Sequence, residues 1–69
     1  METATFTVNG EVRACQGTLT VAALLVELAL QQKKIAVEKN GTIIPKSQHA
    51  TVPICPGDVL EIITAVGGG

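Results

Sequence analysis

Val59-Leu60-Glu61-Ile62-Ile63-Thr64-Ala65-Val66 is the longest run of strand-forming residues in the chain, and it leads directly into Gly67-Gly68-Gly69. Successive side chains of a strand point to opposite faces. One face therefore carries Leu60, Ile62 and Val66, and the other carries Val59, Ile63 and Ala65, with Glu61 exposed to solvent. Apolar residues on both faces are typical of a strand inside a sheet. We therefore predict a central last strand that holds the start of the glycine tail at a fixed point.

The glycine tail is the main candidate for function. Glycine has no Cβ and loses much conformational entropy when it is ordered, so three glycines do little for stability. Three extended residues span about 10 Å, enough to thread a carboxylate into a narrow channel of another protein. A frayed chain end is the alternative. If Ile63 and Ala65 are uncovered, they offer an apolar surface on which a partner can dock.

Length and composition limit the class of protein. The 69 residues predict one domain, and a hydrophobic content of 46% is normal for a globular chain. The net charge of -1 and the single aromatic residue, Phe6, exclude the cationic and stacking surfaces of a nucleic-acid-binding protein. We expect no signal peptide after Met1, and the apolar stretch from Val21 to Leu30 contains Glu27 and is too short for a membrane span. These features predict a cytoplasmic protein without a membrane partner.

Candidate catalytic residues are few. Cys15 and Cys55 lack metal-ligand spacing, so we expect free thiols or small apolar residues, and no metal site. His49 is expected to be a solvated loop histidine, since no nucleophile or carboxylate pairs with it nearby. The sequence shows no carboxylate pair and no phosphate-binding loop at usable spacing. We therefore predict that the chain is not an enzyme and binds no cofactor itself.

The segment from Thr3 to Cys15 predicts a β-hairpin around Asn9-Gly10. A two-residue loop would pair Phe6 with Arg13 and mix apolar with charged side chains on one face. A three-residue loop over residues 8–10 pairs Phe6 with Val12 instead. Because a slip of one residue moves every side chain to the other face, we predict the three-residue loop, with Gly10 in the left-handed conformation of a bulge.

A helix is predicted next. Thr20 is the better of two candidate N-caps, and the apolar stripe that follows has helical spacing, with Val21, Leu24, Leu25 and Leu28. Lys33 and Lys34 are expected near its C-terminal end, where the helix dipole favours cations. Val26 and Leu30 fall off the stripe, and either widen the contact with the core or are exposed.

Short strands fill the rest of the chain. Residues 35–38 and 42–44 are expected to be strands on either side of a second Asn-Gly turn, and Pro45 is expected to end the second of them. Residues 46–51 are expected to form a polar irregular loop, and Pro56-Gly57 suits a type II turn. This order of elements predicts an α+β fold, the ubiquitin-like β-grasp, with a mixed sheet and one main helix packed on one face. We expect residues 1–66 to form the domain and residues 67–69 to form a flexible C-terminal tail.

Several segments together resemble the thiamine-biosynthesis sulfur carrier family, the ThiS family, over essentially the whole chain. They are Val8-Asn9-Gly10-Glu11, Thr20-Val21-Ala22-Ala23-Leu24-Leu25, Ala36-Val37-Glu38-Lys39-Asn40-Gly41, Ile44-Pro45-Lys46, Pro56-Gly57-Asp58-Val59-Leu60-Glu61-Ile62-Ile63-Thr64 and the Gly-Gly end. The Asn-Gly turns alone are weak indicators, whereas the ordered set with the terminal glycines is specific.

The resemblance implies a mechanism. An E1-like adenylyltransferase would use ATP and magnesium, which belong to that enzyme, to convert the Gly69 carboxylate to an acyl-adenylate. A persulfide or thiolate from a cysteine desulfurase system would displace AMP and leave a thiocarboxylate, and thiazole synthase would take the sulfur for the thiazole ring of thiamine. Gly69 would carry the sulfur and Gly67 and Gly68 would supply reach. Ile63, Ala65 and Val66 would dock the partner.

Three other functions stay open. The small subunit of molybdopterin synthase resembles this fold and also ends in Gly-Gly, although the short length and the Asn-Gly and Pro-Lys pattern argue against it. A protein modifier would form isopeptide bonds through Gly69. A non-carrier ubiquitin-like interaction domain would keep its function when Gly68 and Gly69 are deleted.

Overall fold

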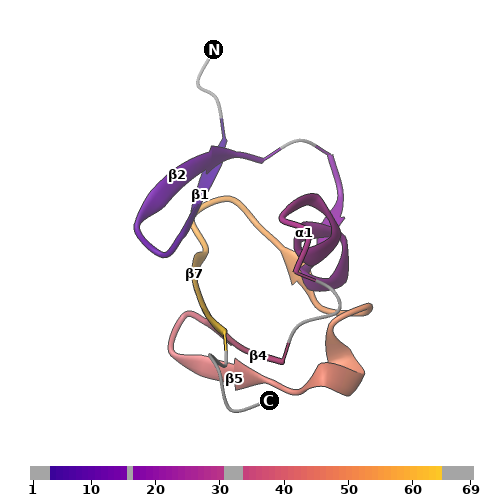
Figure 1. Ribbon diagram of the computed structural model, residues 1–69. Helices are drawn as coiled ribbons and strands as arrows, with labels where there is room; N and C mark the ends of the chain where they lie inside the picture. The colour runs from indigo at the N-terminus through magenta and orange to yellow at the C-terminus, as the bar shows by residue number, and fades with distance from the viewer. Residues whose placement is uncertain (1–3, 16, 31–33, 65–69) are drawn as a thin grey trace.

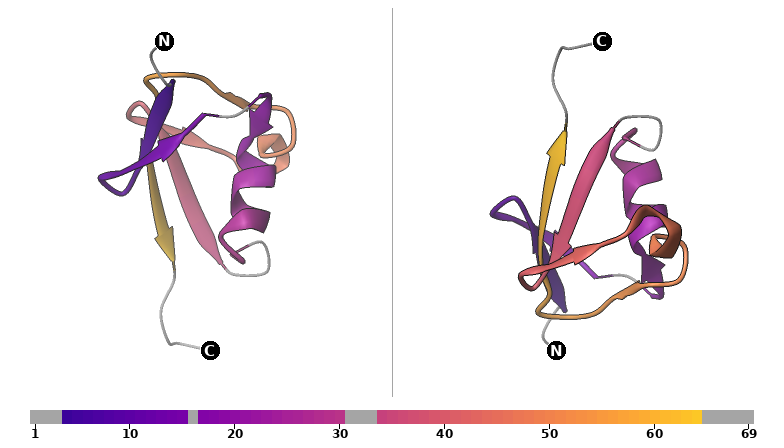
Figure 2. Two further views of the ribbon diagram at one scale, coloured as in Figure 1. Left: turned by 90° about the horizontal axis from the view of Figure 1, so that it is seen from above. Right: turned by 90° about the horizontal axis from the view of Figure 1, so that it is seen from below.

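The computed structural model describes residues 4–15, 17–30 and 34–64, and it forms a β-grasp domain. Five strands make one mixed sheet in the order β2-β1-β7-β4-β5 (Figure 1), with β1 at Thr5–Val8, β2 at Glu11–Ala14, β4 at Ile35–Lys39, β5 at Thr42–Ile44 and β7 at Val59–Thr64. Helix α1 at Val21–Glu27 lies across one face of this sheet (Figure 2). A two-stranded sheet of β3 at Leu19–Thr20 and β6 at Pro53–Ile54, and the 3-10 helix η1 at Lys46–Gln48, complete the described elements. The fold class predicted from the sequence is thus confirmed.

Strand β7 is the centre of the sheet, as predicted. It runs parallel to β1 and antiparallel to β4. Leu60 and Ile62 point to the helix side and are buried, whereas Val59 and Ile63 point away from it and are more than half exposed. The two apolar faces therefore have different surroundings. One face is covered by the core, and the other is open within the described residues.

Helix α1 begins where the sequence predicts. The Thr20 hydroxyl accepts a hydrogen bond from the Ala23 amide at 3.1 Å, which satisfies one free amide of the first turn. Its apolar stripe packs onto the sheet, with Leu28 half-buried at its end. The buried apolar core consists of Phe6, Val8, Val21, Leu24, Leu25, Val37, Ile54, Leu60 and Ile62.

The C-terminal end of the helix differs from the prediction. The helix ends at Glu27, and its last turn contains no basic residue, so the prediction for Lys34 was wrong, while Lys33 lies outside the described residues. The cause is Ala29, which adopts a left-handed φ of 59°. The Ala29 amide bonds to the Val26 carbonyl and the Leu30 amide to the Leu25 carbonyl, the two bonds of a Schellman motif. Val26 is exposed, and Leu30 packs half-buried against the core.

The register predicted for the first hairpin was wrong. Phe6 pairs with Arg13, and the loop holds two residues, Asn9 and Gly10, at φ of 51° and 85°. Two positive φ values are the signature of a type I′ turn, whose twist matches that of the flanking strands. Strand β2 is an edge strand, so it does not need an apolar inner face. Arg13 lies on the side of Phe6 and reaches Glu27 of the helix, and Val12 is left 68% exposed.

The segment after β5 is more ordered than predicted. Pro45 ends the strand as expected, but residues 46–48 form η1. His49 is only 8% exposed, so the expectation of a solvated histidine was wrong. Its ring Nε2 lies 3.2 Å from the Ile44 carbonyl oxygen, and its own carbonyl accepts a bond from the Ala22 amide at 2.8 Å. A buried polar ring is tolerated because it has this hydrogen-bond partner.

The last turn and the cysteines agree with the sequence. The Asp58 amide donates to the Cys55 carbonyl at 3.1 Å and Gly57 has φ of 87°, which confirms the type II turn. Cys15 is half-buried, Cys55 is exposed, and both are free thiols. The predicted boundary between domain and tail, at residues 66 and 67, lies outside the described residues and stays a prediction.

Candidate functional site

The candidate site is the end of β7, from which the chain continues toward the glycines. Of the residues predicted to act there, Ile63 lies within the described part of the chain, and it is 57% exposed. Ala65, Val66 and Gly67 to Gly69 lie outside the described residues, so their roles stay predictions. What the structure describes is the base of the site, that is, the strand and its supports.

The face of the sheet opposite the helix carries exposed apolar side chains. Ile63 and Val59 of β7 share this face with Ile43 of β5, which is 58% exposed. In the strand register Glu38 lies opposite both Glu61 and Ile43. Two carboxylates therefore face each other among apolar residues, and this like-charge pair weakens the sheet. Exposed apolar side chains that share one face are nevertheless typical of a surface that binds another protein.

The first Asn-Gly turn holds β7 from one side. The Asn9 amide donates to the Leu60 carbonyl at 2.9 Å. The Asn9 side chain then forms two bonds to Ile62, accepting from its amide at 2.8 Å and donating to its carbonyl at 3.2 Å. This side chain therefore continues the pairing of β1 with β7 by one further step.

The second Asn-Gly turn holds β7 from the other side, near its start. The Asn40 amide donates to the Val59 carbonyl at 2.7 Å, and its side-chain oxygen accepts from the Val59 amide at 2.9 Å. The two asparagines have almost the same φ, 51° and 53°. In the sequence, each Asn-Gly pair indicates only a turn. It does not show that the two asparagine side chains bind the last strand.

Asp58 joins three segments just before β7. It is 8% exposed, and its carboxylate accepts from the Cys55 amide at 2.7 Å and the Asn40 side chain at 3.0 Å, with the Lys39 ammonium at 3.5 Å. Burial raises the pKa of this carboxyl, but the hydrogen bonds from Cys55 and Asn40 and the charge of Lys39 outweigh it, so the pKa lies below its ordinary value of 3.8. This set of contacts anchors the start of the strand, and no pattern in the sequence indicates it.

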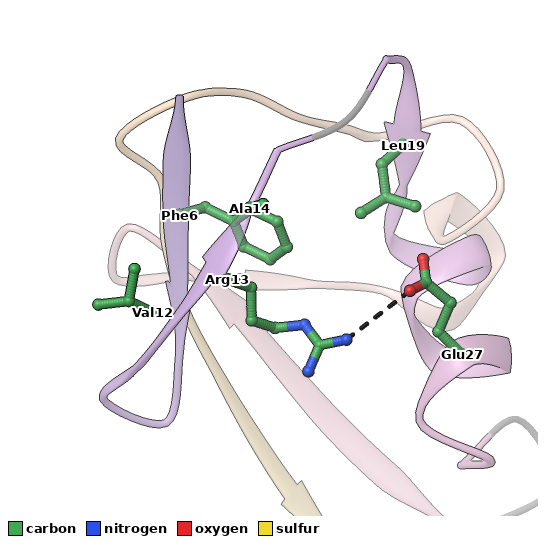
Figure 3. A pocket seen from close by; sticks show the side chains of 6 residues that line it. All are labelled: Phe6, Val12, Arg13, Ala14, Leu19 and Glu27. Atoms are coloured by element: carbon green, nitrogen blue, oxygen red, sulfur yellow. Dashed lines mark ion pairs between the residues drawn. The ribbon is translucent and has the colours of Figure 1, made fainter. Parts of the chain in front are cut away.

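Two cavities formed by described residues lie away from the end of β7. One of about 400 Å³ opens between the first hairpin and α1, with Arg13 reaching across it toward Glu27 at 3.7 Å (Figure 3). Phe6, Ala14 and Leu19 contribute its apolar wall. A second, of about 250 Å³, lies between α1 and η1 beside His49. Neither is lined by a residue predicted to act at the tail.

Two further features concern the described residues alone. In the ranges 4–15, 17–30 and 34–64, histidine, cysteine and acidic side chains do not gather in groups of three that could hold a metal ion. The helices in this part of the chain lack the length and apolar character that a membrane crossing requires.

Comparison with known proteins gives the family. The family model described as "ThiS family" matches residues 6–69. The sulfur carrier protein ThiS of Bacillus subtilis is 40% identical over 62 residues, which cover 88% of this chain and 94% of that protein. A thiazole synthase of Paramagnetospirillum magneticum is 48% identical over 62 residues, or 90% of this chain, but the matched part spans only 19% of that longer protein.

A solved structure agrees. The crystal structure of the thiamine biosynthesis protein ThiS from Geobacter metallireducens superposes with a TM-score of 0.77 at 31% identity, covering 94% of this chain and 99% of that one. Because the family model covers nearly the whole sequence and the B. subtilis relative matches over nearly its full length, the chain belongs to the ThiS family of small sulfur carrier proteins of thiamine biosynthesis, which are not enzymes.

Proposed function

We propose that this chain carries sulfur as a thiocarboxylate on Gly69 and delivers it for synthesis of the thiazole ring of thiamine. The observation that carries the proposal is the family match, which extends through Gly69. The central position of β7 supports it, because β7 pairs with β1 near its start and with β4 as far as Thr64, which gives the tail a fixed base. Gly67 and Gly68 supply reach between this base and the reacting carbonyl.

The chemistry explains why other proteins must act on the tail. A carboxylate resists attack because of its negative charge, so an E1-like adenylyltransferase first joins Gly69 to AMP, using ATP and magnesium and releasing pyrophosphate. A persulfide from a cysteine desulfurase system then attacks the carbonyl and AMP leaves. The product is an acyl disulfide, in which the new bond joins carbon to sulfur. A second thiol then attacks the donor's sulfur and cleaves the sulfur–sulfur bond that came with the persulfide, which frees the thiocarboxylate and leaves a disulfide on the donor. Glycine suits each step because it does not hinder attack at its own carbonyl.

The exposed sheet face is the proposed docking surface. Ile63 is the described member of the predicted set with Ala65 and Val66, and Val59 and Ile43 extend the surface across the sheet. The Glu38 and Glu61 carboxylates between them favour a partner with a cationic group at this position. An interface core needs such apolar groups, since a few well-buried residues supply most of the binding energy.

Thiazole synthase is proposed as the acceptor of the sulfur. A segment similar to 90% of this chain occurs within a longer protein named thiazole synthase, which supports a close association of the two activities. The adenylyltransferase and the cysteine desulfurase system are proposed from the chemistry alone. The role places the protein in the cytoplasm, where ATP and reduced thiols are available.

Intact-mass measurement tests the proposal. The chain is incubated with ATP, magnesium, a matching adenylyltransferase and a sulfur source, and the expected result is replacement of one terminal oxygen atom by sulfur. A chain lacking Gly68 and Gly69 serves as the control, because deletion of Gly69 alone would leave a Gly-Gly end, and it should show neither this change nor ATP–pyrophosphate exchange. Sulfur on the deleted chain, or on a cysteine of the intact chain in place of Gly69, would contradict the proposal.

A further inference from the structure

Among the described residues, the last part of β7 has a strand beside it on one side only. Strand β4 pairs with β7 as far as Thr64, through its own residue Ile35, whereas the pairing of β1 stops at Val8 and Leu60. Figure 2 shows the same arrangement. The turn between β1 and β2 lies part of the way along β7, and β4 accompanies β7 to its end. On the β1 side, residues beyond Leu60 therefore need another source of support.

Asn9 supplies that support. Its backbone amide donates a hydrogen bond to the Leu60 carbonyl, and its side chain forms hydrogen bonds with both the amide and the carbonyl of Ile62. The two side-chain bonds, at 2.8 and 3.2 Å, replace those that one more residue of β1 would make. The left-handed conformation of Asn9 starts the turn and leaves its side chain directed along the strand, a conformation that asparagine tolerates better than other non-glycine residues.

We propose that Asn9 is a positioning residue for the Gly69 carboxylate. Its side chain fixes Ile62 on the side that β1 does not reach and so holds the described end of β7, from which the chain continues to Gly69. The inference rests on the proposed function, because it assigns to Asn9 a role in presenting Gly69 to the adenylyltransferase. It also concerns docking, since Ile63 follows Ile62 directly and carries the exposed apolar side chain.

Loss of the contact has a specific kinetic consequence. Without it, β4 is the one described strand that hydrogen-bonds to the backbone of Ile62 to Thr64, and each residue that frays must be ordered again when the partner binds. This ordering weakens binding of the ground state and the transition state equally. The expected effect is therefore a rise in the KM for the carrier without a matching fall in kcat.

Asn40 is a matched control. It has the same residue type, turn and φ, and it also loses two side-chain bonds when replaced, one to the Val59 amide and one to Asp58. These bonds lie at the start of β7, away from Ile62 to Thr64. Asn40→Gly should therefore lower global stability without affecting presentation of the tail. Glycine preserves the positive φ in both variants, so both turns remain possible.

The experiment compares Asn9→Gly and Asn40→Gly with the unchanged chain in ATP–pyrophosphate exchange by the matching adenylyltransferase. The carrier concentration is varied at a temperature where circular dichroism shows all three chains folded. For Asn9→Gly we expect KM to rise roughly three- to tenfold, as two lost hydrogen bonds permit, with kcat within about twofold. Hydrogen exchange at the Ile62 and Ile63 amides should accelerate in Asn9→Gly and stay close to that of the unchanged chain in Asn40→Gly.

The outcomes separate the two claims. If the unchanged chain supports no exchange, the proposed function fails, and the positioning role fails with it. If the unchanged chain is active and the two variants change KM equally, or if Asn9→Gly lowers only kcat, the carrier function stands and the positioning role of Asn9 is overturned. Unaltered hydrogen exchange at Ile62 in Asn9→Gly also overturns it.

Discussion

Replacement of Asp58 by asparagine is the most direct test of how the start of β7 is held. The carboxylate accepts from two donors, the Cys55 amide and the Asn40 side chain, and lies 3.5 Å from the Lys39 ammonium. An asparagine side chain has one oxygen and one NH₂ group. In either orientation, its NH₂ group faces one of the two donors, so Asp58→Asn removes a hydrogen bond, sets two donors against each other and deletes the ion pair.

The magnitude follows from the kind of bond that is lost. A hydrogen bond to a charged group contributes about 1.5–3 kcal/mol, and leaving a buried donor unpaired adds to the loss. The Asp58 side chain is 11% exposed, so water can replace little of the hydrogen bonding that is lost. We expect the free energy of unfolding at neutral pH to fall by about 2–4 kcal/mol. A domain of this size has roughly 3–10 kcal/mol in total, so its Tm should fall by roughly 10–25 °C.

The pH dependence of the free energy of unfolding provides a second, independent test of the role of Asp58. The folded pKa of Asp58 is depressed below 3.8, because the hydrogen bonds and Lys39 outweigh the effect of burial. The stability from this group is therefore fully present above the ordinary pKa and is lost as pH falls through the folded pKa. The difference between the unchanged chain and Asp58→Asn should be largest at neutral pH and should shrink as pH falls below 3.8.

The assay is urea unfolding followed by far-ultraviolet circular dichroism at several pH values. Glu61→Gln is the matched control, since it removes the same charge from an exposed position that faces Glu38. It should be neutral or stabilise by up to about 0.5 kcal/mol. A loss under about 1 kcal/mol for Asp58→Asn at neutral pH, or a difference that does not shrink in acid, would refute the role given to this carboxylate.

Three further substitutions test other parts of the structure. Ala29→Gly should raise the free energy of unfolding by about 0.5–1 kcal/mol, because glycine adopts the φ of 59° without strain. A loss of stability in urea unfolding would contradict the left-handed conformation at this end of the helix. His49→Ala should lower the free energy of unfolding by about 1–3 kcal/mol, since it removes a buried ring whose Nε2 lies 3.2 Å from the Ile44 carbonyl oxygen, whereas replacement of a solvated histidine would give almost no change. Ile63→Thr should change stability by less than about 1 kcal/mol, yet raise the KM for adenylylation, and an unchanged KM would remove Ile63 from the docking surface.

The fold could be predicted from the sequence because its signals are local and agree with one another. The helical spacing after Thr20, the two Asn-Gly turns and the long apolar last strand each point to the same order of elements, and the structure has that order. The start of the helix could be located because a threonine cap acts over three residues. The end could not, since it depends on Ala29 adopting a conformation that alanine rarely takes.

The errors arose where tertiary contacts override the local pattern. Pairing Phe6 with Val12 would have put apolar residues together, but β2 is an edge strand, and Arg13 finds its partner on the helix, 14 residues away. His49 lies in a polar stretch, but the loop folds back so that its ring meets the Ile44 carbonyl. Neither contact produces a periodic signal, so a method based on spacing does not detect it.

The candidate site shows the same division between local signal and distant contact. The apolar character of Ile63 and its place on the open face of β7 could be predicted from alternation along the strand. The role of Asn9 could not, because its bonds to Ile62 span 53 residues and its neighbours in the sequence indicate only a turn. Asn9, which in the sequence looks like an ordinary turn residue, therefore supports the strand that leads to Gly69. The other asparagine, Asn40, supports the opposite end of that strand. The two turns are alike in sequence and conformation but differ in their distance from the tail, and this difference makes the pair a test of whether the strand's end matters for sulfur transfer.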